Sequence, residues 1–381
     1  MSPERTPSVL LAVEQLRRRV PGGIGAYVDG LLGGLAECAA AGDGAEVALL
    51  ASRNPGGRRA DDPLSRFGLP VITSPLPGPV LTRAWDHRLS HAPDGFDIVH
   101  AVSLAVPPLR RSSGSRLVVT VHDVAWHHHP EATTRRGLRW HEAALERIEA
   151  GGAALVAPSR LVAADLVACG VDADRITVVW NGADHLPAPD PAAAEAVLGR
   201  VAVTGAFLLS VCTLEPRKNV DRLIRAFVRV RPSLPAPWPL VIVGPSGWGR
   251  EPAHPAATQG VVFTGAVSGP ALAELYRRSR AFAYVPLSEG YGMPPLEAMR
   301  AGTPTVVSDQ VPSVHDLGDQ GPAPARVVDP LDVGDIAAGL ADVLTDDALR
   351  ADLAARGAAH ARARTWREAA RRHITLWRAV R

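Results

Sequence analysis

The segment Glu289-Gly-Tyr-Gly-Met-Pro-Pro-Leu-Glu297 joins a strand-like run at 281–285 to a helix-like run at 294–301. Proline suits the first turn of a helix because its fixed φ is already helical, which puts Glu297 near the third helical position. A short buried strand, a glycine-containing loop and a helix are the repeating parts of a parallel α/β sheet. The segment therefore predicts one strand–loop–helix unit with a carboxylate at each end.

The same alternation extends over the rest of the chain and divides into two sets. Helices between successive strands indicate parallel sheets that are covered by helices. The pattern lapses over 186–205, where several prolines interrupt it, and we interpret this stretch as a connection between two domains. The expected strands are 8–13, 46–51, 98–101, 117–121, 154–157 and 176–179 in the first set, and 207–211, 239–243, 260–264, 281–285, 305–307 and 326–328 in the second.

Composition excludes several classes of protein. The chain has 381 residues, 46% of them hydrophobic, which is typical of globular domains and not of disorder. The formal net charge is only +2, so wholesale nucleic-acid binding is not expected. Three widely spaced cysteines exclude a disulfide framework and suit the cytoplasm. No apolar run approaches the roughly 20 residues that span a membrane, and no export signal is recognisable.

Lys218 is the only lysine among 41 basic residues, a bias towards arginine that is typical of a GC-rich, actinobacterial genome. It follows Arg217 in a loop after the predicted strand 207–211, and Asn219 is expected to cap the next helix. Two cations at a helix N-terminus are unfavourable unless an anion joins them. The pattern favours a phosphate site over a solvated turn in which Arg217 pairs with Glu215.

Glu289 and Glu297, the two carboxylates of the segment 289–297, differ in whether a structural role accounts for them. Glu297 is accounted for as a carboxylate near a helix start. Glu289 has no evident partner in the sequence, and the glycines beside it, Gly290 and Gly292, let backbone amides approach a ligand closely. Glu289 is therefore the stronger candidate for a functional role.

These motifs closely resemble retaining glycosyltransferases of family 4, which have the GT-B fold. The two glutamates eight residues apart, followed by Ala301-Gly-Thr-Pro-Thr-Val-Val-Ser308, carry most of the resemblance. Further stretches run in the family's order over nearly the whole chain: Gly22-Gly-Ile-Gly25, Val121-His-Asp123, Ala157-Pro-Ser159, Val178-Val-Trp-Asn-Gly-Ala-Asp184, Leu214-Glu-Pro-Arg-Lys-Asn219 and Phe263-Thr-Gly265.

The resemblance implies an α/β architecture of two Rossmann-like domains whose parallel sheets face a central cleft. Residues 1–188 would form the acceptor-binding domain and residues 203–362 the domain that binds a nucleotide sugar. Residues 363–381 would form a helix that packs back on the N-terminal domain, and Thr365 and Glu368 there have the spacing of a capping box.

The resemblance also implies roles for single residues. Lys218 and Arg217 would neutralise the donor diphosphate, Glu297 would bind the ribose, and Glu289 would lie against the donor sugar. The catalytic set is Glu289, His122 and Lys218, and the donor-binding set is Gly23, Arg217, Lys218, Val267, Gly290, Gly292, Met293 and Glu297. One departure from the family is Cys212-Thr213, where many members place Gly-Arg and so have a further phosphate-binding arginine.

The implied reaction transfers a hexose, with retention, from a nucleotide sugar to a hydroxyl of a glycan or lipid-linked acceptor, without metal or other cofactor. GDP-mannose is the expected donor. The alternatives are UDP-glucose, UDP-GlcNAc or dTDP-rhamnose with the same mechanism, a nucleotide-sugar epimerase, or a non-catalytic sugar-binding protein on the same scaffold. Arginines at 135–139 and in the last helix also allow weak peripheral contact with the inner membrane face.

Three other motifs have simpler explanations. Gly23-Ile-Gly25 could open a dinucleotide-binding loop, but Val28 stands where the third glycine is required. Asp172-Ala-Asp174 matches the metal-binding pair of another glycosyltransferase architecture, and turn capping explains it better. The run His127-His128-His129 could bind a metal, but it has no matching cluster of ligands and is expected in an exposed loop.

Overall fold

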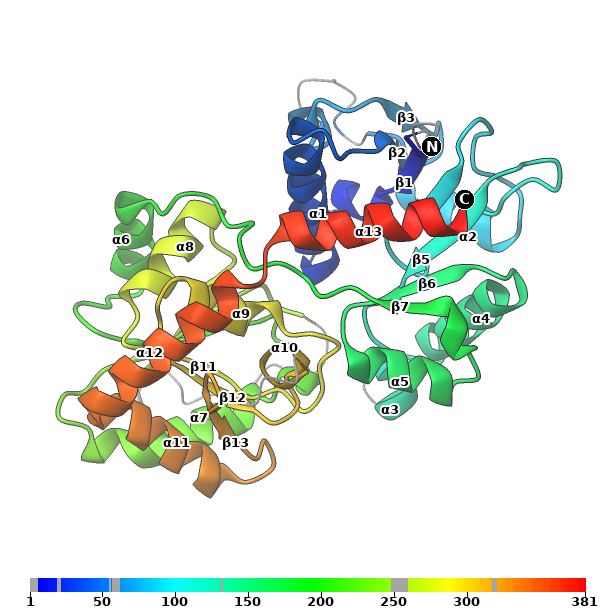
Figure 1. Ribbon diagram of the computed structural model, residues 1–381. Helices are drawn as coiled ribbons and strands as arrows, with labels where there is room; N and C mark the ends of the chain where they lie inside the picture. The colour runs from blue at the N-terminus through cyan, green and yellow to red at the C-terminus, as the bar shows by residue number, and fades with distance from the viewer. Residues whose placement is uncertain are drawn as a thin grey trace. The chain divides into compact units, whose positions relative to one another are not determined.

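A computed structural model of the protein describes residues 6–18, 22–54, 56, 62–130, 133–247, 260–316 and 321–381. The chain divides into two compact units. Unit 1 combines Met1–His185 with Thr365–Arg381, and unit 2 is Leu186–Arg364. In Figure 1, unit 1 therefore contains both the blue start and the red end of the chain.

Within the residues that the structure describes, unit 1 contains a seven-stranded parallel sheet of order β3-β2-β1-β4-β5-β6-β7. Its strands are β1 (Ser8–Ala12), β2 (Glu46–Ala51), β3 (Val71–Thr73), β4 (Ile98–Ala101), β5 (Arg116–Thr120), β6 (Ala154–Ala157) and β7 (Ile176–Val178). Its α-helices are α1 (Gly22–Ala40), α2 (Gly78–Asp86), α3 (Ala125–His128), α4 (Arg135–Ala150), α5 (Arg160–Ala168) and α13 (Trp366–Val380).

Unit 2 contains, in its described part, a six-stranded parallel sheet of order β10-β9-β8-β11-β12-β13. Its strands are β8 (Leu208–Val211), β9 (Leu240–Val243), β10 (Val261–Gly265), β11 (Ala281–Tyr284), β12 (Thr305–Ser308) and β13 (Arg326–Val328). Its α-helices are α6 (Pro191–Arg200), α7 (Val220–Val230), α8 (Gly269–Arg278), α9 (Met293–Arg300), α10 (Pro312–His315), α11 (Val333–Thr345) and α12 (Asp347–Arg362). The expected fold of two Rossmann-like domains is confirmed.

The stretch 186–205 holds a helix of unit 2, whereas the sequence indicated only a connection. Pro191 occupies the first turn of α6, and the Asp190 carboxylate accepts hydrogen bonds from the amides of Ala192 (2.9 Å) and Ala193 (3.1 Å). A proline that seemed to break the pattern is thus the first residue of a helix. Glu195 of α6 pairs with Arg278 of α8 at 2.7 Å.

Helix α13 packs against α1 within unit 1, and two glycines make the contact possible (Figure 1). A Cβ atom on Gly30 would lie 2.0 Å from the Trp366 ring, and one on Gly34 would lie 2.1 Å from the Trp366 carbonyl oxygen. Asp184 also holds the start of α13, because its carboxylate accepts a 2.8 Å hydrogen bond from the Trp366 amide. The expected Thr365 cap is present and accepts from the Glu368 amide.

A chain of buried hydrogen bonds joins the same helix to the sheet. Nδ1 of His373 contacts the Ala369 carbonyl at 2.8 Å, so it carries the ring proton, and Nε2 of the neutral ring accepts from Tyr27 at 3.0 Å. The Thr120 hydroxyl then donates to Tyr27 (3.1 Å) and accepts from Nε2 of His100 (2.9 Å). All four side chains are buried. His100 is thus a core residue of unit 1.

A matched pair of glycine substitutions tests the α1–α13 contact. Gly34→Ala should lower the stability of unit 1 by roughly 3 kcal/mol, because the new methyl group meets backbone that cannot move aside without displacing α13. Gly33→Ala, one position away with nothing within 4 Å of its Cβ, should raise stability by roughly 0.5–1 kcal/mol. Urea unfolding followed by tryptophan fluorescence measures both, and equal effects would contradict the packing.

The buried histidine predicts acid sensitivity in unit 1. Burial lowers the pKa of His373 to about 4 in the folded protein, below the value of about 6.5 expected when unfolded. Stability should therefore be full above pH 6.5 and fall by up to about 3 kcal/mol as the pH drops to 4, because only the unfolded chain takes the proton there. Urea unfolding at several pH values should show a shallower fall in His373→Gln. The exposed control His87→Gln should keep the slope of the parent protein.

Candidate active site

The order of the unit 2 sheet brings two functional loops together. Strand β8 lies between β9 and β11, so the strand order reverses at the β8–β11 pair. Ligands of open parallel sheets bind outside the carboxyl ends of the strands at such a point. The loop after β8 carries Arg217 and Lys218, and the loop after β11 carries Glu289.

Glu289 is the centre of the charged cluster that these loops form. Lys218 is ion-paired with Oε1 of Glu289, and Arg217 lies 3.3 Å from Oε2. Tyr284, the last residue of β11, donates a 2.7 Å hydrogen bond to Oε1 and accepts one from Lys218 at 3.1 Å. The carboxylate that had no evident partner in the sequence therefore has three.

The environment keeps Glu289 ionised. Burial alone would raise the pKa of its carboxyl, but the charges of Lys218 and Arg217, together with hydrogen bonds from Lys218 and Tyr284, outweigh burial and lower the pKa to about 2. Burial likewise holds the pKa of the Tyr284 hydroxyl well above its usual value, so this group stays a donor.

Arg217 and Lys218 contact a second carboxylate, Glu215, in addition to Glu289. Arg217 also pairs with Glu215 at 3.0 Å and donates to the Ser288 carbonyl at 2.8 Å. Lys218 lies 3.9 Å from Glu215. Two cations thus face two carboxylates, Glu215 and Glu289, and the cluster is close to neutral. The alternative of a solvated turn is right about the Arg217–Glu215 pair but wrong about solvation, since only 15% of the Arg217 side chain and 12% of the Lys218 side chain are exposed.

Asn219 was expected to cap α7 with its side chain, but it positions the loop after β8 instead. Its side chain makes no capping hydrogen bond to α7, and its backbone is left-handed with φ 58°. Its buried amide instead donates to the carbonyls of Val285 (2.9 Å) and Pro330 (2.8 Å). Asn219 therefore ties the loop after β8 to the end of β11, which fixes Lys218 against Glu289.

Glu297 lies two residues deeper in its helix than the sequence predicted. Helix α9 begins at Met293, so Glu297 is its fifth residue and not its third. The side chain is buried, and Oε2 accepts a 2.8 Å hydrogen bond from the Tyr276 hydroxyl of α8. The carboxylate is thus oriented by a tyrosine of the neighbouring helix.

The glycine loop before α9 is tightly built. Gly292 is buried with φ 88°, a conformation that favours glycine, and a Cβ there would lie 2.6 Å from Val311. Ser313 donates to the Gly292 carbonyl at 2.7 Å. Met293 begins the helix, Gly290 is buried in the loop, and Val267 is half-buried in the loop after β10.

Two candidate residues belong to unit 1. His122 follows β5, and its Nε2 donates to the Val102 carbonyl at 2.8 Å. Burial lowers the pKa of His122, so the neutral ring leaves Nδ1 as an acceptor. Gly23 is exposed in the first turn of α1.

The two alternative metal motifs have structural explanations. Asp172 caps a short turn by accepting from the Asp174 amide at 3.0 Å, as expected. His127 and His128 lie on the short helix α3 and not in a loop, and His128 pairs with Asp165 at 3.0 Å. The described residues contain no group of three potential metal ligands.

Comparisons with known proteins agree with this arrangement. The family model described as Glycosyl transferases group 1 matches residues 200–360, and the one described as Glycosyltransferase Family 4 matches residues 21–185. The O-antigen chain mannosyltransferase B of Escherichia coli is 29% identical over 69% of this chain and 70% of that protein. The chain belongs to the GT-B glycosyltransferases of the family 4 type. It is a hexosyltransferase.

Other relatives match over less of their length or share only the fold. The serotype-specific mannosyltransferase WbdA of Escherichia coli is 31% identical over 45% of this chain, which spans only 21% of that protein. HepE of Anabaena, solved with UDP and glucose, has a TM-score of 0.69 at 17% identity and matches 97% of this chain and 99% of its own. Sucrose-phosphate synthase of Thermosynechococcus elongatus has a TM-score of 0.72 at 20% identity, with 98% and 99% covered.

Cys212-Thr213, where many members of the family have Gly-Arg, is uncharged in this glycosyltransferase. Cys212 is buried, and burial raises the pKa of its thiol to about 12. The neighbouring backbone is closely packed, because a Cβ on Gly244 would lie 1.9 Å from the Cys212 carbonyl oxygen. Cys212 therefore contributes no charge to a phosphate site, and Thr213, which stands where many members have arginine, has only an uncharged hydroxyl.

Sequence reasoning missed the two tyrosines of this glycosyltransferase site. The sequence places Tyr284 in the predicted strand 281–285 and indicates no functional role for either tyrosine. A tyrosine at the carboxyl end of a buried strand, just before the functional loop, was the available signal for Tyr284. No comparable signal marked Tyr276, because its partner Glu297 lies 21 residues away on another helix.

Proposed function

We propose that this glycosyltransferase transfers mannose from GDP-mannose, with retention of configuration, to a hydroxyl of a glycan or lipid-linked acceptor. The single observation that supports a nucleotide-sugar site is the buried Lys218–Glu289–Arg217 cluster at the point where the sheet order reverses. The mannosyltransferase names of the relatives support the choice of sugar. HepE, a fold relative, was solved with UDP-glucose, and UDP-glucose is therefore the second candidate donor.

In this proposal Lys218 and Arg217 bind the donor diphosphate. Breaking the bond between sugar and phosphate builds negative charge on the phosphate, and fixed cations stabilise the charge that develops there. Because the cluster is close to neutral without donor, the diphosphate would share the cations with Glu289 and Glu215. Asn219 and Ser288 keep the cations in place while this happens.

Glu289 and Glu297 would contact different parts of the donor. Glu289 would lie against the sugar, whose anomeric carbon becomes positive in the transition state. Its low pKa of about 2 keeps it ionised, so it can stabilise that positive charge. Glu297, oriented by Tyr276, would bind the ribose hydroxyls. The Gly290, Gly292 and Met293 backbone and Val267 would complete the donor contacts.

Unit 1 would bind the acceptor. Its residues Gly23 and His122 would act on the diphosphate and the sugar, respectively. The neutral His122 ring would use Nδ1 to accept a hydrogen bond from a sugar hydroxyl, since Nε2 is occupied by the Val102 carbonyl. The leaving phosphate would take the acceptor's proton on the face where the new bond forms, which preserves the configuration.

We place this reaction in the cytoplasm, without metal. Cys38, Cys169 and Cys212 are free thiols. Among the described helices, none is long and apolar enough to cross a membrane. Weak contact with anionic lipid would use the exposed Arg135, Arg136 and Arg139 of α4. The arginines of α13 are less available, because Arg371 and Arg378 pair with Asp43.

A donor panel tests the function. The protein is incubated in excess EDTA with GDP-mannose, UDP-glucose, UDP-GlcNAc or dTDP-rhamnose and a glycan acceptor, and release of nucleoside diphosphate is measured. GDP release that depends on acceptor is expected, and the anomeric configuration of the product is read by NMR. A sugar interconverted without acceptor would indicate an epimerase. Activity that needs manganese, or binding without turnover, would contradict the proposal.

Replacing each carboxylate separates the two roles. Glu289→Gln should lower kcat by about 10²-fold, because it removes charge that acts in the transition state. Glu297→Gln should mainly raise the donor KM, because the ribose changes little during the reaction. Calorimetry should also show that Glu289→Gln binds the released diphosphate more tightly than the parent does, since it frees Lys218 and Arg217. The reverse pattern of kcat and KM would exchange the two roles.

A further inference from the structure

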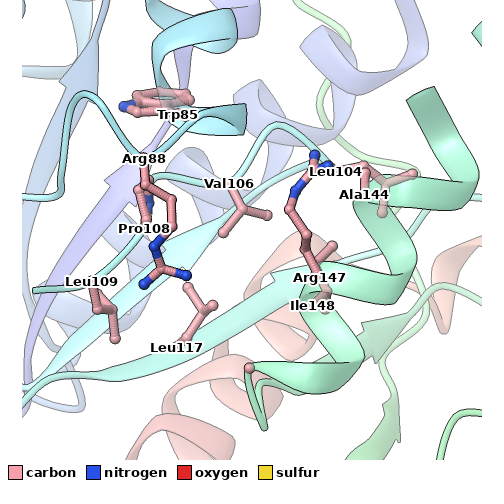
Figure 2. A pocket seen from close by; sticks show the side chains of 11 residues that line it. Trp85, Arg88, Leu104, Val106, Pro108, Leu109, Leu117, Ala144, Arg147 and Ile148 are labelled. Atoms are coloured by element: carbon pink, nitrogen blue, oxygen red, sulfur yellow. The ribbon is translucent and has the colours of Figure 1, made fainter. Parts of the chain in front are cut away.

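Unit 1 contains a pocket of about 150 Å³. It is lined by Leu104, Val106 and Leu117 and by residues of α2 and α4 (Figure 2). Leu117 lies near the amino end of β5, and Gly151 of the lining comes just before β6. The pocket is therefore placed towards the amino ends of these strands, whereas His122 follows the carboxyl end of β5. It is separate from the candidate active-site residues.

The lining is apolar except for two arginines. Arg88 and Arg147 lie on either side of Val106 in Figure 2, and no acidic residue lines the pocket. Arg147 is held in place by Asp86 at 2.7 Å, and Asp86 is itself held by the Trp140 indole at 2.8 Å. The Arg88 guanidinium forms no hydrogen bond or ion pair with any residue that the structure describes.

The backbone of Arg88 is unusual for an arginine. Its φ of 56° is left-handed, and it follows α2 at the place where helices usually end with glycine. The Leu89 amide donates back to the Ala84 carbonyl at 2.8 Å, and the Arg88 amide donates to the Trp85 carbonyl at 3.0 Å. A side chain costs conformational energy there that glycine would not. Such local strain is a reason to look for a function of the side chain.

We propose that this pocket binds a small amphipathic anion, with a short apolar chain or ring among Leu104, Val106 and Leu117 and its carboxylate or phosphate head on Arg88. The volume matches the apolar part, since a cavity of about 150 Å³ accepts a group the size of benzene. The guanidinium matches the head, because its planar fork of donors binds carboxylate and phosphate oxygens in pairs. Arg147 also lines the pocket, but Asp86 compensates its charge, so Arg88 is the residue that binds the head group in this proposal.

Four probes, three of them with the same six-carbon chain, test the proposal on the full chain by calorimetry. Hexanoate and hexyl phosphate carry both parts of the ligand, hexan-1-ol lacks the charge, and inorganic phosphate lacks the chain. At least one of the two anions should bind with a Kd ten or more times lower than hexan-1-ol and inorganic phosphate. The tighter of the two identifies the head group. If neither anion binds, or if the alcohol binds equally well, the proposal is wrong.

Substitutions locate the binding. Arg88→Gly should weaken the preferred anion at least tenfold without lowering Tm, because glycine suits the left-handed backbone. Val106→Phe fills the apolar part and should weaken it similarly while Arg88 remains. Arg83→Ala removes an exposed arginine of α2 that does not line the pocket, and this variant should bind the anion as the parent does. Unchanged binding in Arg88→Gly and Val106→Phe would place the anion elsewhere and overturn the proposal.

Discussion

The reversal of strand order at β8 and β11 is the constraint on which the rest of unit 2 depends. Because the two strands are parallel neighbours, the loops that leave their carboxyl ends start side by side. Residues 71 positions apart in the chain, Lys218 and Glu289, meet there as a buried ion pair. The loop after β11 could not hold the Glu289 charge without the cations of the other loop, since a buried ion without a partner costs several kcal/mol.

The cluster explains how a buried site stays ready for an anion. Each cation is already compensated by a carboxylate, so the protein is stable without donor, and neither side chain needs to move far when a diphosphate arrives. Tyr284 contributes a neutral donor that keeps Glu289 ionised without adding charge. The free-energy cost of bringing these charges together is met when the protein folds, so the charges need no reorganisation during the reaction.

Sequence reasoning predicted the sheets well and the loops incompletely. Most strands were predicted within a residue or two, because buried parallel strands are short aliphatic runs between turn residues. The three-residue β3 was missed, since it is only half-buried. Helix α6 was missed because Pro191 starts the helix and does not interrupt it.

The candidate site shows the same limit at the level of side chains. Spacing and charge singled out Lys218, Arg217 and Glu289, since these residues are unusual where they stand. Their mutual contacts could not be predicted, because they depend on the left-handed backbone of Asn219 and on the tyrosines Tyr284 and Tyr276, which come from neighbouring elements. The site's residues are thus encoded locally, and its geometry is set by tertiary structure.

The end of the chain is held in unit 1 by contacts that specify one arrangement. At the start of α13, Trp366 packs against Gly30 and Gly34. A side chain at either position would prevent this contact. Further along α13, the hydrogen bonds from His373 to His100 all run in one direction. Each hydroxyl has one proton to donate, and the Ala369 carbonyl fixes the tautomer of His373. A shift of α13 by one residue would break both contacts together. The C-terminal helix is therefore fixed in register by steric fit at one end and by hydrogen-bond direction in its middle, which apolar packing alone would not achieve.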